Sequence, residues 1–111
     1  MTTEEVISKL DLKPLSKFNH RDVNGVFVSD MLSDVMAGAQ SGNLWVTIQT
    51  HKSIIPAANL VDVSAIIITS GKQISQETED FANQYDIAVL STELSTFEMV
   101  GKLYALGLVN Q

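Results

Sequence analysis

The sequence predicts an α/β fold, a three-layer α/β/α sandwich with a mainly parallel sheet of about four strands. Short apolar runs alternate with segments of helical periodicity, and such alternation gives right-handed crossovers, a parallel sheet and helices on both faces. The predicted strand at residues 65–69 has the apolar core AIII, which is typical of burial on both faces in the middle of a parallel sheet. Residues 87–90 predict another short apolar strand.

Residues 25–51 predict a strand, a helix and a second strand in close succession. The first strand is apolar, and Asp30 is placed to cap the helix that follows it. Gly42 suits the C-cap of that helix, and residues 44–50 return as a β-branched strand. Five apolar side chains have the spacing of one buried helix stripe: Met31, Leu32, Val35, Met36 and Ala39.

The segment before this unit predicts one helix and one short strand. Thr2 and Glu5 have the spacing of a capping box, which places a helix over residues 3–10. Residues 13–15 follow as a brief strand. Pro14 confines that strand to a sheet edge, because proline cannot donate a ladder hydrogen bond.

Serine side chains mark the starts of the three later helices. Ser53 and Ser75 stand where N-caps are expected, and Ser95 forms a second capping box with Glu98. Gly107 is placed to end the last helix. The predicted apolar stripes of the last two helices are Thr78, Phe81, Ala82 and Tyr85, and then Phe97, Val100, Leu103, Tyr104 and Leu106.

The strand at residues 44–50 has mixed polarity on one side. Its two sides alternate as Leu44, Val46 and Ile48 against Trp45, Thr47 and Gln49. A strand covered by helices on both faces should not carry Thr and Gln inside. The Trp45 side is therefore interpreted as an edge, a pocket wall or a subunit interface, and a partly solvated edge strand explains the same pattern.

The composition favours one globular domain over residues 1–111. The net charge is −6, and an acidic chain of this size is repelled by nucleic acid and by anionic lipid. The absence of cysteine excludes disulfides and thiolate chemistry. The charged amino-terminal stretch does not suit a signal peptide, and no apolar run approaches the roughly 20 residues that span a bilayer. We expect a cytoplasmic protein.

The spacing of reactive side chains assembles no catalytic or metal-binding set. His51 ends a strand, where α/β proteins place functional groups, but no second ligand stands at helical or hairpin spacing from it. Asp30 and Asp34 lie one turn apart and are interpreted as cap and helix-dipole partners. Gly71 lacks the upstream glycine of a phosphate loop. We expect no catalytic residue, no metal and no cofactor.

The carboxyl ends of the predicted strands form the candidate ligand-binding site, because loops and helix starts converge there in open α/β sheets. Hydroxyls dominate this edge and suit a small anionic or nucleotide-like metabolite, bound with a Kd on the order of micromolar or weaker. The alternative is that these residues only cap helices and close turns. The ten candidates are Asp30, Thr50, His51, Thr69, Ser70, Gly71, Ser91, Thr92, Ser95 and Thr96.

We also predict a homodimer. The mixed polarity of the Trp45 side suggests an interface, and three methionines lie on or near the helix stripes: Met31, Met36 and Met99. Soft apolar side chains at a surface often mark contacts. The alternative is that all three methionines fill the core.

Three blocks of the sequence, in matching order and spacing, resemble the DRTGG domain family over about residues 12–108. They are VFVSDMLSDVMAGA, LWVTIQTHKSI and AIIITSGKQISQETEDFANQYDIAVLSTELSTFEMV. That family is similar to the amino-terminal domain of HPr serine kinase/phosphorylase and, more remotely, to the first domain of certain muramyl ligases. The resemblance implies a three-layer α/β/α domain with a regulatory or assembling role, usually attached to modules such as nucleotide-sensing CBS pairs or phosphate acetyltransferase.

The chain departs from the motif that gives this family its name. Thr50-His51-Lys52 stands where Asp-Arg-Thr is expected, and Thr69-Ser70-Gly71 stands where Thr-Gly-Gly is expected. Only Thr69 and Gly71 keep the family's residue. The phosphate loop of the kinase belongs to a different domain, so the resemblance does not imply kinase activity.

The function we expect is a stand-alone regulatory or ligand-sensing domain without catalytic activity. One alternative is an adaptor subunit that docks on a larger cytoplasmic enzyme complex. Another is a small enzyme that uses His51 or the loop at residues 91–96. Saturable heat release with phosphorylated metabolites favours the sensor, and turnover abolished by His51→Ala would favour the enzyme.

Overall fold

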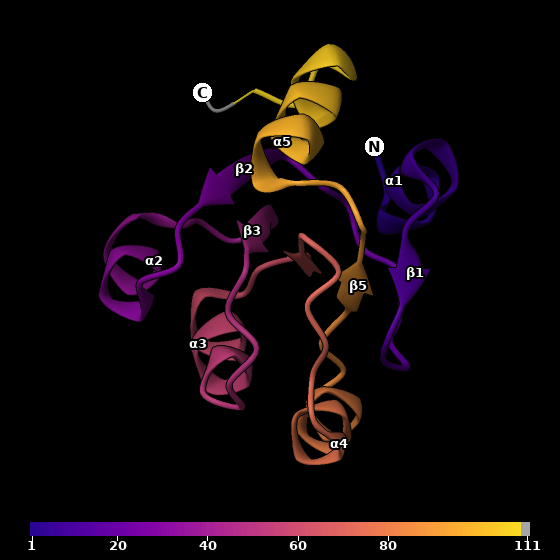
Figure 1. Ribbon diagram of the computed structural model, residues 1–111. Coiled ribbons are helices and arrows are strands. Elements are labelled where there is room, and N and C mark those ends of the chain that lie inside the picture. The colour runs from indigo at the N-terminus through magenta and orange to yellow at the C-terminus, as the bar shows by residue number, and fades with distance from the viewer. Residues whose placement is uncertain (110–111) are drawn as a thin grey trace.

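The computed structural model describes residues 1–109, within which one five-stranded sheet lies between two layers of helices (Figure 1). The sheet order is β1-β5-β4-β3-β2. The elements are α1 (Thr3–Leu10), β1 (Lys13–Pro14), β2 (Gly25–Val28), α2 (Leu32–Gly38), β3 (Asn43–Thr47), α3 (Ile54–Val61), β4 (Ala65–Ile68), α4 (Gln76–Gln84), β5 (Val89–Ser91) and α5 (Thr96–Ala105).

The sheet confirms the predicted α/β class and its mainly parallel character. Strands β2 to β5 are parallel and lie beside one another in chain order. Phe27, Trp45, Ile66 and Val89 are successive partners across them. The sheet has five strands rather than about four, because β1 pairs antiparallel with β5 and forms the edge.

The connections decide which face each helix covers. Helices α2, α3 and α4 join successive parallel strands and lie on one side of the sheet, whereas α1 and α5 lie on the other (Figure 1). A right-handed crossover between neighbouring parallel strands always places its helix on the same face when the strands advance in one direction. We refer to these as the α2–α4 layer and the α1/α5 layer.

Each layer encloses its own apolar cluster. Neighbouring residues of one strand supply opposite clusters, so Ile66 and Ile68 face the α2–α4 layer while Ile67 faces the α1/α5 layer. The α2–α4 cluster also holds Trp45 and, from α3, Ile54 and Ile55 with other buried residues. The α1/α5 cluster is completed by Val6, Leu44, Val46, Leu90, Met99 and Leu103, among others.

The prediction for the Trp45 side of β3 is wrong. Strand β3 lies between β2 and β4, and all five of its residues are buried. Trp45 is 0% exposed within the α2–α4 cluster, and its indole Nε1 donates to the Ser29 carbonyl at 2.8 Å. Thr47 is tolerated inside because its hydroxyl donates to Asp30 Oδ1 at 2.9 Å, since a buried hydroxyl needs a partner. The strand ends at Thr47, before the predicted residue 50.

Several predicted apolar stripes are shifted. On α2 only Val35 is buried, while Met31 and Met36 are exposed. Tyr85 follows α4 and is also exposed. On α5 the buried residues are Met99 and Leu103, whereas Phe97 and Tyr104 project outward at 87% and 70% exposure. Helical spacing predicted one stripe on α5 that included Phe97, Leu103 and Tyr104. These side chains divide into an exposed stripe and a buried one, and only the buried one packs on the sheet.

Both predicted capping boxes are confirmed, at Thr2 with Glu5 and at Ser95 with Glu98. The Ser75 cap is confirmed as well, because its side chain accepts from the Thr78 amide. Gly107 has a φ of 90° and follows α5 as predicted. The Gly107 and Leu108 amides donate to Tyr104 and Leu103, which is a Schellman ending.

Two other predicted caps are wrong, and Ser53 is the N-cap residue of α3 as predicted but forms no side-chain cap bond. Asp30 makes no cap on α2, and the N-cap residue is Met31. Gly42 has a φ of 87° but lies in the turn before β3, four residues beyond the end of α2 at Gly38. In residues 1–109, no helix combines the length and apolar content needed to cross a membrane.

Candidate functional site

The ten predicted ligand-binding residues all lie at or beyond the carboxyl ends of parallel strands or at the start of α5, so they lie along one edge of the sheet. They divide into two groups along that edge. Asp30, Thr50 and His51 follow β2 and β3. The group after β4 and β5 contains Thr69, Ser70, Gly71, Ser91, Thr92, Ser95 and Thr96.

Asp30 ties the end of β2 to the end of β3. Its Oδ1 accepts from the Thr47 hydroxyl and from the Ile48 amide, each at 2.9 Å. The other predicted carboxylate, Asp34, accepts from the Ser29 hydroxyl at 3.3 Å. Both carboxylates therefore serve local structure. Within residues 1–109 there is no group of three or more His, Cys, Asp or Glu arranged to hold a metal ion.

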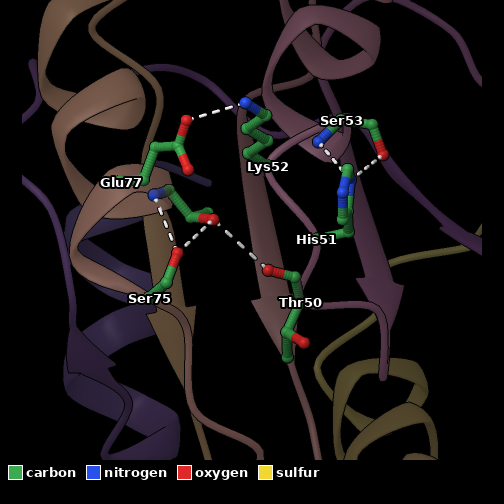
Figure 2. Close-up of polar contacts among 7 residues, drawn as sticks. Thr50, His51, Lys52, Ser53, Ser75 and Glu77 are labelled. Carbon is green, nitrogen blue, oxygen red and sulfur yellow. Dashed lines mark hydrogen bonds and ion pairs between the residues drawn. The ribbon is translucent and has the colours of Figure 1, made fainter.

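The loop at residues 50–53 joins β3 to α3 and faces the start of α4 (Figure 2). Lys52 Nζ forms an ion pair with Glu77 Oε1 at 2.7 Å, and it lies 5.9 Å from the centre of the Phe81 ring. The Thr78 hydroxyl donates to the Thr50 carbonyl at 3.4 Å. Thr50 and Lys52 thus connect α4 to the end of β3.

His51 turns toward its own loop rather than toward α4 (Figure 2). The Ser53 amide donates to His51 Nδ1 at 3.1 Å, and the Ser53 hydroxyl lies 2.9 Å from the same nitrogen. An amide can only donate, so Nδ1 is an acceptor and the ring proton of the neutral form is on Nε2. In a Ser–His–Asp site, Nδ1 would instead donate to the orienting carboxylate.

The chain changes face between β4 and β5. The connection after β4 leads to α4 on one side of the sheet, and the connection after β5 leads to α5 on the other. Ligands in open α/β sheets bind where neighbouring connections diverge in this way. This is where Gly71 and Ser91 lie.

Three hydrogen bonds join the two diverging connections. The Ser70 amide donates to the Leu94 carbonyl at 2.7 Å, and the Gly71 amide donates to the Thr92 carbonyl at 2.9 Å. Thr69 is buried, and its hydroxyl shares a 2.7 Å hydrogen bond with the Thr96 hydroxyl. We call these three contacts the loop bridge. These contacts hold the start of α5 to the end of β4. They use the hydroxyls of Thr69 and Thr96, which were predicted to bind ligand.

Other hydroxyls of this group also have local partners. The Thr92 hydroxyl accepts from the Leu94 amide at 3.2 Å. The Ser95 hydroxyl caps α5 by accepting from the Glu98 amide at 3.2 Å. These bonds are the capping and turn-closing roles that the sequence left as the alternative to ligand binding.

A pocket of about 350 Å³ opens beside the loop bridge, on the α4 side of β5. It includes only two of the ten predicted residues, Gly71 and Ser91. Lys13 enters it because β1 pairs with β5 and places Lys13 opposite Ser91. The remaining lining residues are Leu15, Lys72, Gln73, Ile74, Ser75, Gln76, Glu79 and Glu93.

The pocket carries charges of both signs. Lys13 and Lys72 are exposed cations on its rim, and Glu79 and Glu93 contribute carboxylates. Gly71 has a φ of 64°, and a Cβ at this position would collide with the Glu93 carboxylate. The positive φ favours glycine here, and Glu93 would have to turn away to admit a side chain.

Sequence reasoning missed Lys13 as a member of this site. Strand β1 has only two residues, and nothing in such a short segment specifies which strand it joins. The one available signal was Pro14, which predicted an edge strand. Sequence reasoning also missed Lys72, because its neighbours in the pocket come from β1 and α4.

Comparison with known proteins gives a family and a fold. No curated protein matches the chain. A crystal structure of the CBS and DRTGG domains from the regulatory region of Clostridium perfringens pyrophosphatase, complexed with the activator diadenosine tetraphosphate, is similar with a TM-score of 0.69 and 18% sequence identity. The match covers 89% of this chain and 44% of that one, so the chain spans less than half of its length. The model of the DRTGG domain matches residues 5–106, and the chain belongs to the DRTGG domain family.

Proposed function

We propose that this DRTGG domain is a regulatory, ligand-sensing domain without catalytic activity, and that it binds a small anionic or nucleotide-like metabolite. The observation that carries the proposal is the pocket where the β4 and β5 connections diverge, with Lys13 and Lys72 on its rim. Lysine ammonium groups and the Ser91 hydroxyl can donate to phosphate oxygens. The similar Clostridium perfringens structure includes a nucleotide activator, which gives the same chemical class for a first panel of ligands.

The state of the candidate reactive groups supports a non-catalytic role. His51 Nδ1 is occupied by Ser53. The hydroxyls of Thr92, Ser95 and Thr96 bond to neighbouring groups of the chain. Within residues 1–109 no carboxylate is hydrogen-bonded to His51, so its contact with Ser53 lacks the third group that orients the base in a Ser–His–Asp site.

Electrostatics set the expected strength of binding. The chain has a net charge of −6, and two carboxylates share the pocket with the two lysines. Attraction for an anion is therefore partly cancelled, and we expect a Kd on the order of micromolar or weaker. Binding should weaken as salt is added, because the two lysines are exposed to solvent.

Isothermal titration with inorganic phosphate, pyrophosphate, AMP, ATP and diadenosine tetraphosphate tests the proposal. At least one of these should bind saturably. Lys13→Gln and Lys72→Gln should each weaken it by about two- to fivefold, since an exposed charge pair contributes up to roughly 1 kcal/mol. Lys52→Gln is the matched control, because Lys52 pairs with Glu77 outside the pocket.

Two results would contradict the proposal. Binding weakened by His51→Ala but not by either pocket variant would move the site to the loop after β3. Turnover that is lost in His51→Ala would make the domain an enzyme. Gly71→Val is a poor probe, because the side chain would strain a φ of 64° and collide with Glu93.

A further inference from the structure

The outer side of α5 carries two strongly exposed aromatic side chains. Phe97 and Tyr104 are 87% and 70% exposed, the highest values among the aromatic residues described. They are seven residues apart, two turns of the same helix, and so lie on one flank. Figure 1 shows α5 on the outside of its layer, with no other element over its outer side. Exposed aromatic clusters of this kind mark interaction surfaces.

The rest of this surface has a definite order across the helix. Gly101 and Ala105 lie next to the aromatic flank, and Glu98 and Lys102 lie beyond them on the opposite flank. All of these residues are exposed. A Cβ built on Gly101 meets no atom within 4 Å, so a second helix can approach the backbone closely at this point.

We propose that this surface, formed by Phe97, Glu98, Gly101, Lys102, Tyr104 and Ala105, pairs with the same surface of a second copy of the chain. In an antiparallel pair related by a two-fold axis, each flank of one helix meets the same flank of the other. The aromatic flanks would then face each other, and so would the charged flanks. The small residues between them would form the crossing point.

Two independent contacts require the same alignment of the helices. Placing Phe97 beside Tyr104 of the second copy brings Glu98 to within about one residue, or about 1.5 Å along the axis, of Lys102 of the second copy. Opposite charges therefore meet twice, once on each side of the two-fold axis. If the helices ran parallel, each flank would meet the opposite flank, and the charged side chains would face the aromatic ones.

The charged groups are available for such a pair. The two ion pairs found in residues 1–109 are Arg21 with Asp62 and Lys52 with Glu77, so Glu98 and Lys102 do not pair within their own helix. The capping box uses only Oε1 of Glu98. Tyr104 also lines an apolar groove of about 510 Å³ between α5 and β2, with Val28 and Val100. Phe97 of the second copy would lie at the mouth of this groove.

This dimer goes beyond the proposed function and does not depend on a ligand. It uses a different surface from the homodimer predicted from the sequence, because Trp45 and Met99, on which that prediction relied, are buried. A single helix surface gives a small interface, so we expect a Kd on the order of 10 µM.

Sedimentation equilibrium at concentrations above and below that value tests the pairing. The chain should show a reversible monomer–dimer equilibrium. Phe97→Ser should raise the Kd by about tenfold or more, as expected for a central aromatic contact. Lys102→Glu should raise it several-fold, and the double variant Glu98→Lys with Lys102→Glu should restore dimerisation because the charges are again complementary. Circular dichroism of the double variant checks that α5 survives the loss of its capping box.

The control is Tyr85→Ser, which removes an exposed aromatic residue from the other helical layer. It should leave the Kd unchanged. A monomeric mass at every concentration would overturn the proposal. A dimer Kd that is unchanged by Phe97→Ser and Lys102→Glu would place the interface on another surface and overturn the proposal. Loss of the dimer in Tyr85→Ser would do the same.

Discussion

The two helical layers of this domain cover the same sheet by different means. The α2–α4 layer consists of helices held at both ends by strands, and it packs on a cluster dominated by Trp45 and β-branched residues. The α1/α5 layer packs on a cluster that includes Met99 and Leu103. Both capping boxes of residues 1–109 occur on α1 and α5. In the α2–α4 layer only α4 has a side-chain N-cap bond, from Ser75, whereas both helices of the α1/α5 layer have a full capping box.

The largest expected difference between the layers comes from two neighbouring isoleucines. Ile66 and Ile67 are both 0% exposed in β4 but face opposite layers. Replacing a buried isoleucine by alanine costs about 2 to 5 kcal/mol. We expect Ile66→Ala to cost about 1 kcal/mol more than Ile67→Ala, because a methionine can move into a cavity more easily than stiff β-branched side chains can. Urea denaturation followed by circular dichroism measures the free energy of unfolding of each variant. Equal losses in the two variants would contradict the contrast between the clusters.

Two glycines at helical positions should respond in opposite directions. Gly101 has open space around it, so Gly101→Ala should stabilise the monomer by about 0.5 to 1 kcal/mol through helix propensity. At Gly38 a Cβ would lie 2.8 Å from Cε1 of the Phe27 ring. Gly38→Ala should therefore destabilise by about 1 kcal/mol, since overpacking outweighs the gain in propensity. Thermal denaturation at protein concentrations well below the dimer Kd compares the stabilities of the two variants. If Gly38→Ala were also stabilised, the Phe27 ring would have to move aside without cost.

The serine caps give a smaller contrast of the same kind. Ser95→Ala should cost about 1 kcal/mol, because its hydroxyl accepts from the Glu98 amide. Ser53→Ala should change stability by less than about 0.5 kcal/mol, as Ser53 makes no cap bond on α3. Thermal denaturation measures the stability of both variants. A large effect at Ser53 would mean that its contacts with His51 hold the loop after β3.

The smallest expected effect is a pH dependence at the start of α1. The backbone hydrogen bond with Thr2 is the main cause that lowers the pKa of Glu5 from its ordinary value of 4.5. A carboxylate whose pKa is lowered by folding contributes stability above its ordinary pKa, and that contribution is lost as the pH falls through the lower folded value. Stability of Glu5→Gln should therefore decline less than that of the wild type below a pH of about 4.5. Identical pH profiles would contradict a role for the charge.

Local signals predicted much of this fold correctly. Capping boxes at Thr2 and Ser95 and the glycine ending at Gly107 are confirmed, because each involves residues within a few positions of one another. The apolar run in β4 correctly indicated burial on both faces. These patterns depend on residues that are close in sequence, so they can be recognised without knowing the fold.

The errors occur where a residue's surroundings come from distant segments. The Trp45 side was interpreted as an edge, a pocket wall or a subunit interface because it carries Thr47, yet Asp30 from another loop satisfies that hydroxyl. Phe97 and Tyr104 share helical spacing with the buried Leu103, and only docking on the sheet separates the two stripes. In the candidate site, the carboxyl edge of the sheet was predictable from strand alternation. Its pocket was not, because Lys13 arrives through a two-residue strand.

The loop bridge has a thermodynamic consequence. It joins Gly71, in the wall of the pocket, to Thr92 and connects Thr69 to the first residue of α5. A ligand that displaces Gly71 would pull on the segment that positions Phe97, and pairing of two α5 helices would restrain Gly71 in return. Such coupling is reciprocal, so the affinity for ligand and the affinity between copies would change by the same factor. Titrations at low and high protein concentration would then give different ligand affinities. The ratio of these affinities would give the coupling free energy between ligand binding and dimerisation.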